Sequence, residues 1–335
     1  MRKVLLFLSF NLVSLFLLAQ DIHFSQFQRS YLNLNPALNG SFDADYRLNA
    51  NYKNQWSAVS EPYRTFSFSG EAKSLFKKQR NIHLGLILFN DEAGLGGLQT
   101  TQFALNLAYS KGLNYDSTLI LKAGIQSGVN ARSINFDRFS YDRQFDGNVY
   151  NPNLESGESF DRSSYTNFAL HSGIALEYII ENRKSFGFGY AAYNLNRSNQ
   201  SFEGSNIPLD VRSNWFIQAD YYLSEKIDLL PSILYSHQGT FKEVLFGSDM
   251  RYRIDESSFK NENVYFGLWY RNKDALILSA GVDYRKLNFG ISYDINVSGL
   301  DVASDNRGGL ELSLTYLIKY YKPKIRRYQA CPDFM

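Results

Sequence analysis

The chain has 335 residues, of which 20% are charged, and its formal net charge at pH 7 is +2. This balance excludes a strongly basic nucleic-acid-binding protein, and the 24 tyrosines and 26 phenylalanines exclude a disordered chain. The length allows one large barrel or two ordinary domains. Many aromatic residues together with 23 glycines are typical of outer-membrane β-barrels, although an extracellular β-sandwich has a similar composition.

The N-terminus, residues 1–19, predicts a signal peptide. Arg2 and Lys3 form a basic start, residues 4–18 are apolar, and Ala19 is a small residue before an expected cleavage at Gln20. An uncleaved anchor helix is disfavoured, because the apolar run is short for a bilayer span. After the expected cleavage site no apolar run approaches the roughly 18 residues of a helical span, so membrane insertion has to use strands.

Alternation of polar and apolar residues predicts β-strands from residue 45 to residue 319. In residues 287–297 every second residue is large and apolar. The residues between them are small or polar: Asn288, Gly290, Ser292, Asp294 and Asn296. Strict alternation is the signal of a strand, and about ten residues is the length of a tilted strand that crosses a bilayer. We expect the polar face to meet water and the apolar face to meet lipid or a second sheet.

About fourteen strands are expected, near residues 45–56, 63–73, 80–92, 98–110, 117–130, 165–179, 184–196, 210–223, 227–236, 241–254, 262–271, 274–285, 287–297 and 310–319. The predicted fold class is therefore all-β: a transmembrane antiparallel up-and-down β-barrel in the outer membrane. With a periplasmic N-terminus, the outward connections include the longest loops, 131–164, 197–209 and 298–307. The inward connections include the short turns 181–183, 224–226 and 285–286. Connections 74–79, 255–261 and 271–274 depart from this pattern.

Short motifs at both ends of the chain are similar to those of a known family. The N-terminal part reads Gln20-Asp-Ile-His-Phe-Ser-Gln-Phe27, then Asn35-Pro36-Ala37, and continues into a strand with Arg47 and the pair Gln55-Trp56. The C-terminal part contains Ser292-Tyr293-Asp294 and Gly308-Gly309-Leu310-Glu311 and ends in Cys331-Pro332-Asp333-Phe334-Met335. In these motifs and in length the chain resembles the PorP/SprF family, outer-membrane proteins of the type IX secretion and gliding motility system of Bacteroidetes.

This resemblance implies a non-enzymatic role in secretion. The protein would bind secreted adhesin-like cargo, help to deliver or anchor it, and link it to periplasmic partners. Expected partners are secretion-system proteins of the periplasm or outer membrane, adhesin-like cargo and outer-membrane lipid, and no nucleic acid. The family-motif positions are expected to shape the periplasmic mouth: Phe24, Asn35, Pro36, Gln55 and Trp56. A diffusion porin or solute channel and a secreted β-sandwich adhesin stay open as alternatives.

The barrel, residues 45–319, is expected to be flanked by two periplasmic segments. Residues 20–44 are predicted to be an ordered N-terminal segment without strands, because Asn35-Pro36 and Asn39-Gly40 are turn dipeptides. Residues 320–335 form a basic tail that either binds acidic partner surfaces or is a solvated extension; its candidate residues are Lys322, Lys324, Arg326, Arg327 and Cys331. Cys331 is the only cysteine, so it has no intrachain partner; an intermolecular disulfide and a buried thiol stay open.

The loop 131–164 is the second candidate for partner binding. It combines aromatic residues with arginines, a composition that is enriched at protein interfaces. The candidates are Phe136, Tyr141, Arg143, Phe145 and Tyr150. The alternative is a plug that folds into the lumen and packs on itself.

No catalytic, cofactor-binding or metal-binding residues are expected. The four histidines are separated in sequence and no cysteine accompanies them. The glycines at 187 and 189 lie inside an alternating strand with no helix after it, so they more simply make room for aromatic neighbours than bind a nucleotide. The carboxylates of Glu177, Asp283 and Asp294 are expected to be solvated lumen residues.

Overall fold

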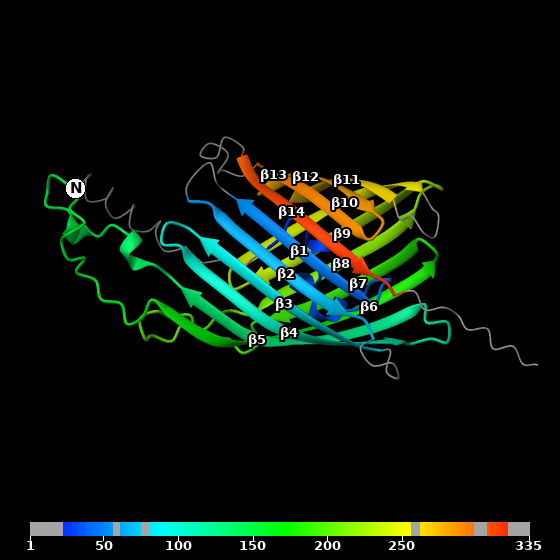
Figure 1. Cartoon of the computed structure of the whole chain (residues 1–335), viewed down its shortest axis with the longest axis horizontal. Coiled ribbons are helices and arrows are strands. Elements are labelled where there is room, and N and C mark those ends of the chain that lie inside the picture. The colour runs from blue at the N-terminus through cyan, green and yellow to red at the C-terminus, as the bar shows by residue number, and fades with distance from the viewer. Residues whose placement is uncertain (1–22, 56–60, 75–80, 256–261, 298–306, 321–335) are drawn as a thin grey trace, which may run out of the picture.

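The computed structural model describes residues 23–55, 61–74, 81–255, 262–297 and 307–320. Fourteen antiparallel strands form a closed barrel in which β1 pairs with β14 (Figure 1). The strands are β1 (Tyr46–Gln55), β2 (Tyr63–Ala72), β3 (Ile82–Ala93), β4 (Leu98–Gly112), β5 (Leu119–Ser133), β6 (Ser164–Glu181), β7 (Lys184–Tyr193), β8 (Arg212–Tyr222), β9 (Ile227–Gln238), β10 (Phe241–Asp255), β11 (Glu262–Arg271), β12 (Ala275–Tyr284), β13 (Leu287–Asn296) and β14 (Arg307–Ile318). The predicted fold class and strand number are confirmed, and a β-sandwich is excluded because the sheet closes on itself.

The two faces of each strand follow the alternation in the sequence. Apolar side chains such as Leu105, Phe266 and Leu314 point outward and are exposed, whereas Ser292 and Asp294 point inward and are buried. In a barrel of this kind the outer apolar surface faces the hydrocarbon of the bilayer. Among the described residues, no helix is long and apolar enough to cross a membrane.

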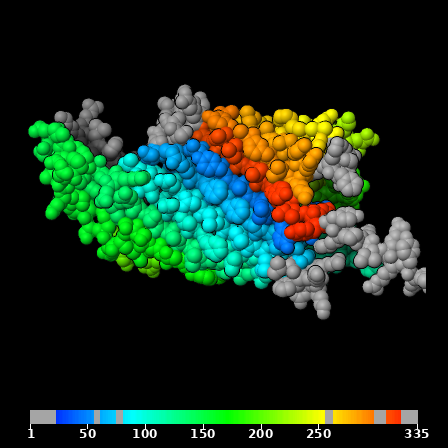
Figure 2. Space-filling view, in the orientation of Figure 1, coloured from blue at the N-terminus to red at the C-terminus, as the bar shows by residue number. Residues whose placement is uncertain are grey.

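The two longest described strand connections lie at the same end of the barrel. The β5–β6 connection, residues 134–163, and the β7–β8 connection, residues 194–211, lie at one end, which we call the loop end. The two-residue turns 182–183 and 285–286 lie at the other, the turn end. Figure 2 shows the green atoms of the long β5–β6 connection extending well beyond the barrel wall. The predicted grouping of the longest loops is therefore confirmed.

The segment before β1 lies inside the barrel, and we call residues 23–44 the plug. It contains three short helices, η1 (Phe27–Arg29), α2 (Tyr31–Leu34) and η2 (Pro36–Leu38), seen in blue within the barrel in Figure 1. The sequence predicts a periplasmic segment with motif residues at the periplasmic mouth, but its described part lies inside the lumen. The segment is almost wholly buried, because the wall supplies both apolar and polar partners for it.

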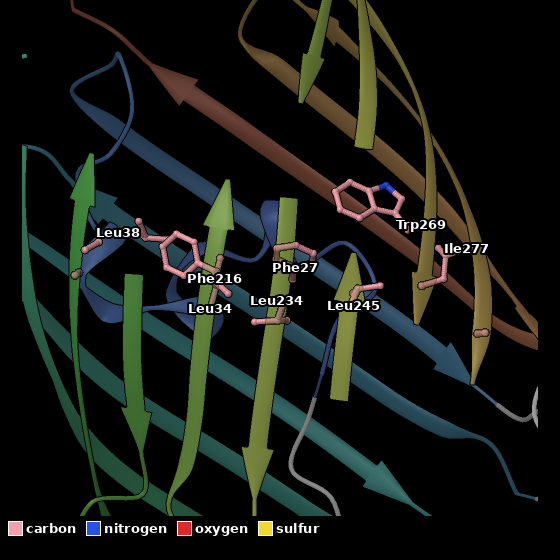
Figure 3. Packing of buried hydrophobic residues seen from close by; sticks show 11 residues of the cluster. Phe27, Leu34, Leu38, Phe216, Leu234, Leu245, Trp269 and Ile277 are labelled. Carbon is pink, nitrogen blue, oxygen red and sulfur yellow. The ribbon is translucent and has the colours of Figure 1, made fainter. Parts of the chain in front are cut away.

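An apolar cluster joins the plug to one side of the wall. Phe27 and Leu34 of the plug pack with Phe216, Leu234 and Trp269 of strands β8, β9 and β11 (Figure 3). The rings of Phe27 and Trp269 meet edge to face, with 5.6 Å between their centroids. Burial of a large apolar side chain contributes roughly 1.5–3 kcal/mol, so several such contacts stabilise the plug in the lumen.

Candidate functional site

Carboxylates of β13 and β14 hold the first residues of the plug. The Glu311 carboxylate accepts hydrogen bonds from the backbone N–H groups of Ser25 (2.7 Å) and Gln26 (2.9 Å). The Ser25 hydroxyl donates to Asp294 at 2.7 Å. The sequence predicts a solvated Asp294, and this prediction is wrong, because the plug buries its carboxylate. The polar face of β13 meets a folded segment of the same chain in place of water.

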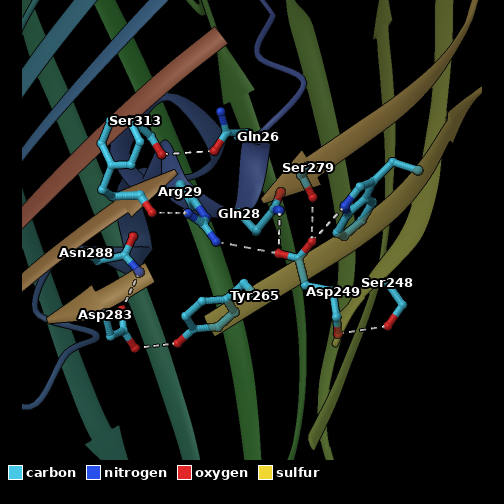
Figure 4. A network of polar contacts seen from close by, with 12 residues as sticks. Gln26, Gln28, Arg29, Ser248, Asp249, Tyr265, Ser279, Asp283, Asn288 and Ser313 are labelled. Atoms are coloured by element: carbon cyan, nitrogen blue, oxygen red, sulfur yellow. Dashed lines mark hydrogen bonds and ion pairs between the residues drawn. The ribbon is translucent and has the colours of Figure 1, made fainter. Parts of the chain in front are cut away.

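Arg29 and Asp249 form the centre of a second polar network, drawn in Figure 4. Arg29 Nη2 lies 3.9 Å from an Asp249 oxygen, and Arg29 Nη1 donates to the backbone carbonyl of Phe289 at 3.3 Å. Asp249 also accepts from Trp269 Nε1 and from Ser279 Oγ, both at 2.9 Å. Paired in this way, the buried charges avoid most of the cost of desolvation.

Asp283 belongs to the same region of the wall and is also buried. Its carboxylate accepts hydrogen bonds from the hydroxyl of Tyr265 and from the side-chain amide of Asn288, both drawn in Figure 4. It also accepts one from the side-chain amide of Asn263. The expectation of a solvated Asp283 is thus wrong. By contrast, Glu177 is partly exposed and pairs with Lys122.

On the opposite side of the barrel, Asn35 ties the plug to the wall. Its side-chain N–H groups donate to the carbonyls of Ile174 and Tyr190, both at 3.0 Å, and its Oδ1 accepts from the Ala37 N–H at 2.8 Å. The wall has no side chain at Gly173, where a Cβ would overlap Asn35 Oδ1. The inward glycines of this wall therefore leave space for the plug as well as for neighbouring aromatic rings.

A recess opens between the plug and the wall near the loop end. It contains about 360 Å³ of empty space, part of it open to solvent. Phe24, Phe27 and Leu234 form its apolar part, and Arg212 and Glu243 its charged part. A neighbouring polar recess shares Arg212 and is lined by the side chains of Gln102, Gln126 and His171, among others.

The two long connections at the loop end pack against each other, and we call residues 134–163 and 194–211 the loop platform. The ring of Phe136 stacks on Phe160 with 3.6 Å between centroids and meets Phe202 edge to face at 6.0 Å. The Tyr165 hydroxyl donates to the carbonyl of Gln200 at 2.7 Å. The alternative that this loop folds into the lumen is wrong, since the lumen is occupied by the plug.

The predicted partner-binding residues of the loop platform have different environments. Phe136 and Tyr141 are half-buried inside it, and the Tyr141 hydroxyl donates to the Phe136 carbonyl at 2.8 Å. Arg143, Phe145 and Tyr150 are exposed. Nearby, the backbone N–H groups of Val149 and Asn148 donate to Asp146 and hold the pKa of its carboxyl below the usual range.

The family-motif positions are split between the lumen and the barrel rim. Phe24, Asn35 and Pro36 are buried in the plug, away from the mouth that sequence analysis proposed. Gln55 ends β1 at the loop end and is also buried. Trp56, the expected signal peptide and the tail residues Lys322, Lys324, Arg326, Arg327 and Cys331 lie outside the described residues.

The sequence did not reveal which residues position the plug, chiefly Arg29, Asp249 and Glu311. Each lies far in sequence from its partner, so its role does not show in the local sequence, even though Glu311 belongs to one of the terminal motifs. The one available signal was glycine at inward positions of the strands, as at Gly173, because glycine inside a strand indicates a close approach of another part of the chain.

Comparison with known families identifies the chain. The model of the family described as "Type IX secretion system membrane protein PorP/SprF" matches residues 17–316, which include the plug and nearly the whole barrel. The chain belongs to the PorP/SprF family. The resemblance inferred from its terminal motifs is thereby confirmed, and so are the outer-membrane β-barrel class and membership of a type IX secretion family. Among curated proteins none matches this PorP/SprF chain.

Solved structures share the barrel fold of this PorP/SprF protein at low sequence identity. The toluene transporter TbuX of Ralstonia pickettii has a TM-score of 0.53 and 11% identity, over 88% of this chain and 94% of its own. A FadL homologue of Pseudomonas aeruginosa has a TM-score of 0.52 and 11% identity, over 86% and 94%. The toluene transporter TodX of Pseudomonas putida has a TM-score of 0.51 and 10% identity, over 86% and 93%. Identities this low support the fold alone.

Proposed function

We propose that this PorP/SprF protein is a non-enzymatic outer-membrane component of the type IX secretion and gliding machinery. In this role it binds adhesin-like cargo at the loop end and helps to deliver or anchor it. The observation that carries the proposal is the family match over residues 17–316, which covers the barrel and the plug together. The signal peptide expected at residues 1–19 would deliver the chain to the periplasm.

The interior of the barrel favours a partner-binding role over a porin through which solutes diffuse. The plug contacts the wall on opposite sides, through Glu311 of β14 and through the carbonyl of Ile174 in β6. A diffusion porin needs an aqueous path through its lumen. A plug fixed by hydrogen bonds, ion pairs and an apolar cluster opposes such a path, so the porin alternative is the weaker one.

The loop platform supplies the surface for cargo. Phe145, Val149 and Tyr150 expose large apolar area there, and Arg143 is exposed beside them. Exposed aromatic residues with a flanking arginine are the usual composition of a protein-binding surface. We place this end outside the cell, because outer-membrane barrels have long outer loops and short periplasmic turns. The turn end and the tail would then meet periplasmic partners.

Removal of the protein from its host and quantitative proteomics of the cell surface test this proposal. We expect loss of one or more large surface proteins from the cell exterior and their recovery by the wild-type gene. The double variant Phe145→Ser and Tyr150→Ser should restore export poorly. Leu95→Ser, an exposed apolar residue in the β3–β4 connection outside the loop platform, is the control and should restore it fully. An unchanged surface proteome, with reduced uptake of small solutes, would favour a channel instead.

A further inference from the structure

Three arginines converge on one buried carboxylate at the turn end, and we call Arg183, Arg251 and Arg253 the arginine cluster. Arg183 lies in the β6–β7 turn, the other two lie near the end of β10, and Asp228 lies near the start of β9. Arg183 Nε and Nη2 contact one Asp228 oxygen at 2.9 and 2.6 Å. Arg251 Nε, Arg251 Nη2 and Arg253 Nε contact the other oxygen, each at 2.8 Å.

Arg183 is sufficient for the structural role of the cluster. It also donates to the backbone carbonyls of Ser224 and Glu225 at 3.1 and 2.8 Å, so it joins the β6–β7 turn to the β8–β9 turn. The Asp228 side chain is fully buried, and a two-pronged pair with one arginine already compensates its charge. Neutralisation of Asp228 therefore does not explain the second and third arginines.

Arg251 and Arg253 have more hydrogen-bond donors than their carboxylate can accept. A guanidinium has five N–H donors, and a carboxylate has about four acceptor sites. Asp228 already receives five contacts from the cluster, so it has no capacity left. In the part of the chain that the structure describes, neither Nη of Arg253 has an acceptor, and neither does Nη1 of Arg251.

The charges around the cluster leave a positive surplus. Besides Asp228, one further carboxylate is near it: Asp220 of β8, which interacts electrostatically with two of the arginines but forms no ion pair within 4.0 Å with a described residue. Glu177, which is also near Asp220, is neutralised by its pair with Lys122. Three arginines against two aspartates leave one positive charge, so an additional anion would be attracted.

Alternation along β10 directs Arg251 and Arg253 into the lumen. Tyr252 and Ile254 are exposed on the outer face, which contacts the bilayer, so a lipid headgroup does not reach the two arginines. The side chains of Arg251 and Arg253 are 16% and 21% exposed, whereas that of Asp228 is 0% exposed. A water-soluble anion that enters at the turn end can therefore contact the arginines.

We infer that the arginine cluster binds carboxylate groups of an acidic polypeptide segment at the turn end. The two Nη groups of Arg253 form a planar fork that matches a carboxylate, and Nη1 of Arg251 supplies a further donor beside it. Arg183 holds Asp228 and the turns in place and so positions the other two. The periplasmic origin of the segment rests on the orientation given in the proposed function, whereas the binding itself does not.

Fluorescence anisotropy with the purified full-length protein in detergent tests the inference. The probe is fluorescein-labelled hexaglutamate, and the neutral comparison is labelled hexaglutamine. We expect hexaglutamate to bind and hexaglutamine to bind at least about tenfold more weakly, since hydrogen bonds to charged groups contribute about 1.5–3 kcal/mol each. Displacement of hexaglutamate by an equal concentration of inorganic phosphate would identify a site for small anions and would overturn the assignment to a polypeptide.

The double variant Arg251→Gln and Arg253→Gln should weaken hexaglutamate binding at least about tenfold. Asp228 keeps both contacts from Arg183 in this variant, so its charge stays compensated. The matched control is Arg285→Gln with Lys286→Gln in the exposed β12–β13 turn, which removes the same charge at the same end and should bind as the wild type does.

Three further results would overturn the inference: no binding of hexaglutamate, equal binding of hexaglutamine, or equal affinity in the two double variants. The peptide comparison uses wild-type protein, so it holds even where a variant does not fold. Binding in detergent needs no secretion, so failure of this site is distinguishable from failure of the cargo role, which the surface proteome measures.

Discussion

Arg47 and Glu71 form a two-pronged ion pair inside the barrel, with Arg47 Nε and Nη2 each 2.8 Å from a different carboxylate oxygen. Both side chains are almost fully buried. The guanidinium also lies 3.5 Å from the centre of the Tyr31 ring and donates to the Leu38 carbonyl at 3.4 Å. One wall residue of β1 therefore contacts its neighbour in β2 and two points of the plug, the start of α2 and the end of η2.

Substitution of Arg47 by alanine should destabilise the protein strongly. The change leaves Glu71 as an uncompensated buried charge, which costs about 3–5 kcal/mol in comparable buried pairs. The free energy of unfolding, measured by urea titration in detergent micelles, should fall by this amount. Lys319→Ala is the control: it breaks the exposed Lys319–Asp43 pair and should change stability by about 0–1 kcal/mol. Equal losses in the two variants would contradict the role assigned to Arg47.

Addition of one methyl group at Gly173 should displace the plug. A Cβ at this position would overlap the Asn35 side chain, and overpacking of this kind costs about 1–3 kcal/mol. We expect Gly173→Ala to raise ion conductance in planar bilayers, because the lumen opens when Asn35 is displaced. In Gly70→Ala the new Cβ would lie 3.5 Å from Leu48, an ordinary contact, so conductance should stay at the wild-type level. Equal conductance in both variants would show that Asn35 does not hold the plug.

An arginine on the outer face of the barrel should destabilise the fold where that face contacts the bilayer, and should leave stability nearly unchanged beyond the bilayer. Leu105 is exposed in the middle of β4, and Leu113 is exposed just after the end of this strand. Leu105→Arg should destabilise the folded barrel by about 2–4 kcal/mol in lipid vesicles, as charged groups at the midplane do. Leu113→Arg should change stability by less than about 1 kcal/mol. A larger loss of stability in Leu113→Arg than in Leu105→Arg would contradict this placement of the bilayer.

The Asp146 turn of the loop platform should loosen in acid. Hydrogen bonds from the Val149 and Asn148 N–H groups lower the pKa of the Asp146 carboxyl. Their stabilising effect is present above the unfolded pKa, which is about 3.9, and it is lost as the pH falls through the lower folded pKa. Hydrogen exchange of the peptide around Val149, corrected for intrinsic rates, should therefore show less protection at low pH than at pH 7. Asp146→Asn should abolish this pH dependence. A pH dependence that persists in the variant would contradict the role assigned to the Asp146 carboxylate.

The strands could be predicted from sequence because their signal is local. In β13 the alternation of Phe289, Ile291 and Tyr293 with Ser292 and Asp294 fixes both the strand and its two faces. What lies against the inner face could not be predicted in this way. The local sequence predicts that Asp294 faces water, and only the position of Ser25, 269 residues away, shows that it is buried.

The contacts within the loop platform could not be predicted from local sequence either. Its aromatic composition indicated binding, but composition does not separate residues that contact a partner from those that hold the loop together. Phe136 stacks within the platform and contacts Phe202 of another connection, whereas Phe145 stays exposed. Terminal motifs were informative for a different reason, since they resemble those of a known family and the model of that family matches residues 17–316.

In the proposed function this barrel is a partner-binding component of the type IX secretion machinery. The most direct test is a mild-detergent pull-down of the tagged full-length protein from outer membranes, with partners identified by mass spectrometry. We expect co-purification of secretion-system proteins from the periplasm or outer membrane, or of a large surface protein. Recovery of the barrel alone, together with steady ion conductance by the wild-type protein in planar bilayers, would contradict it and favour a channel.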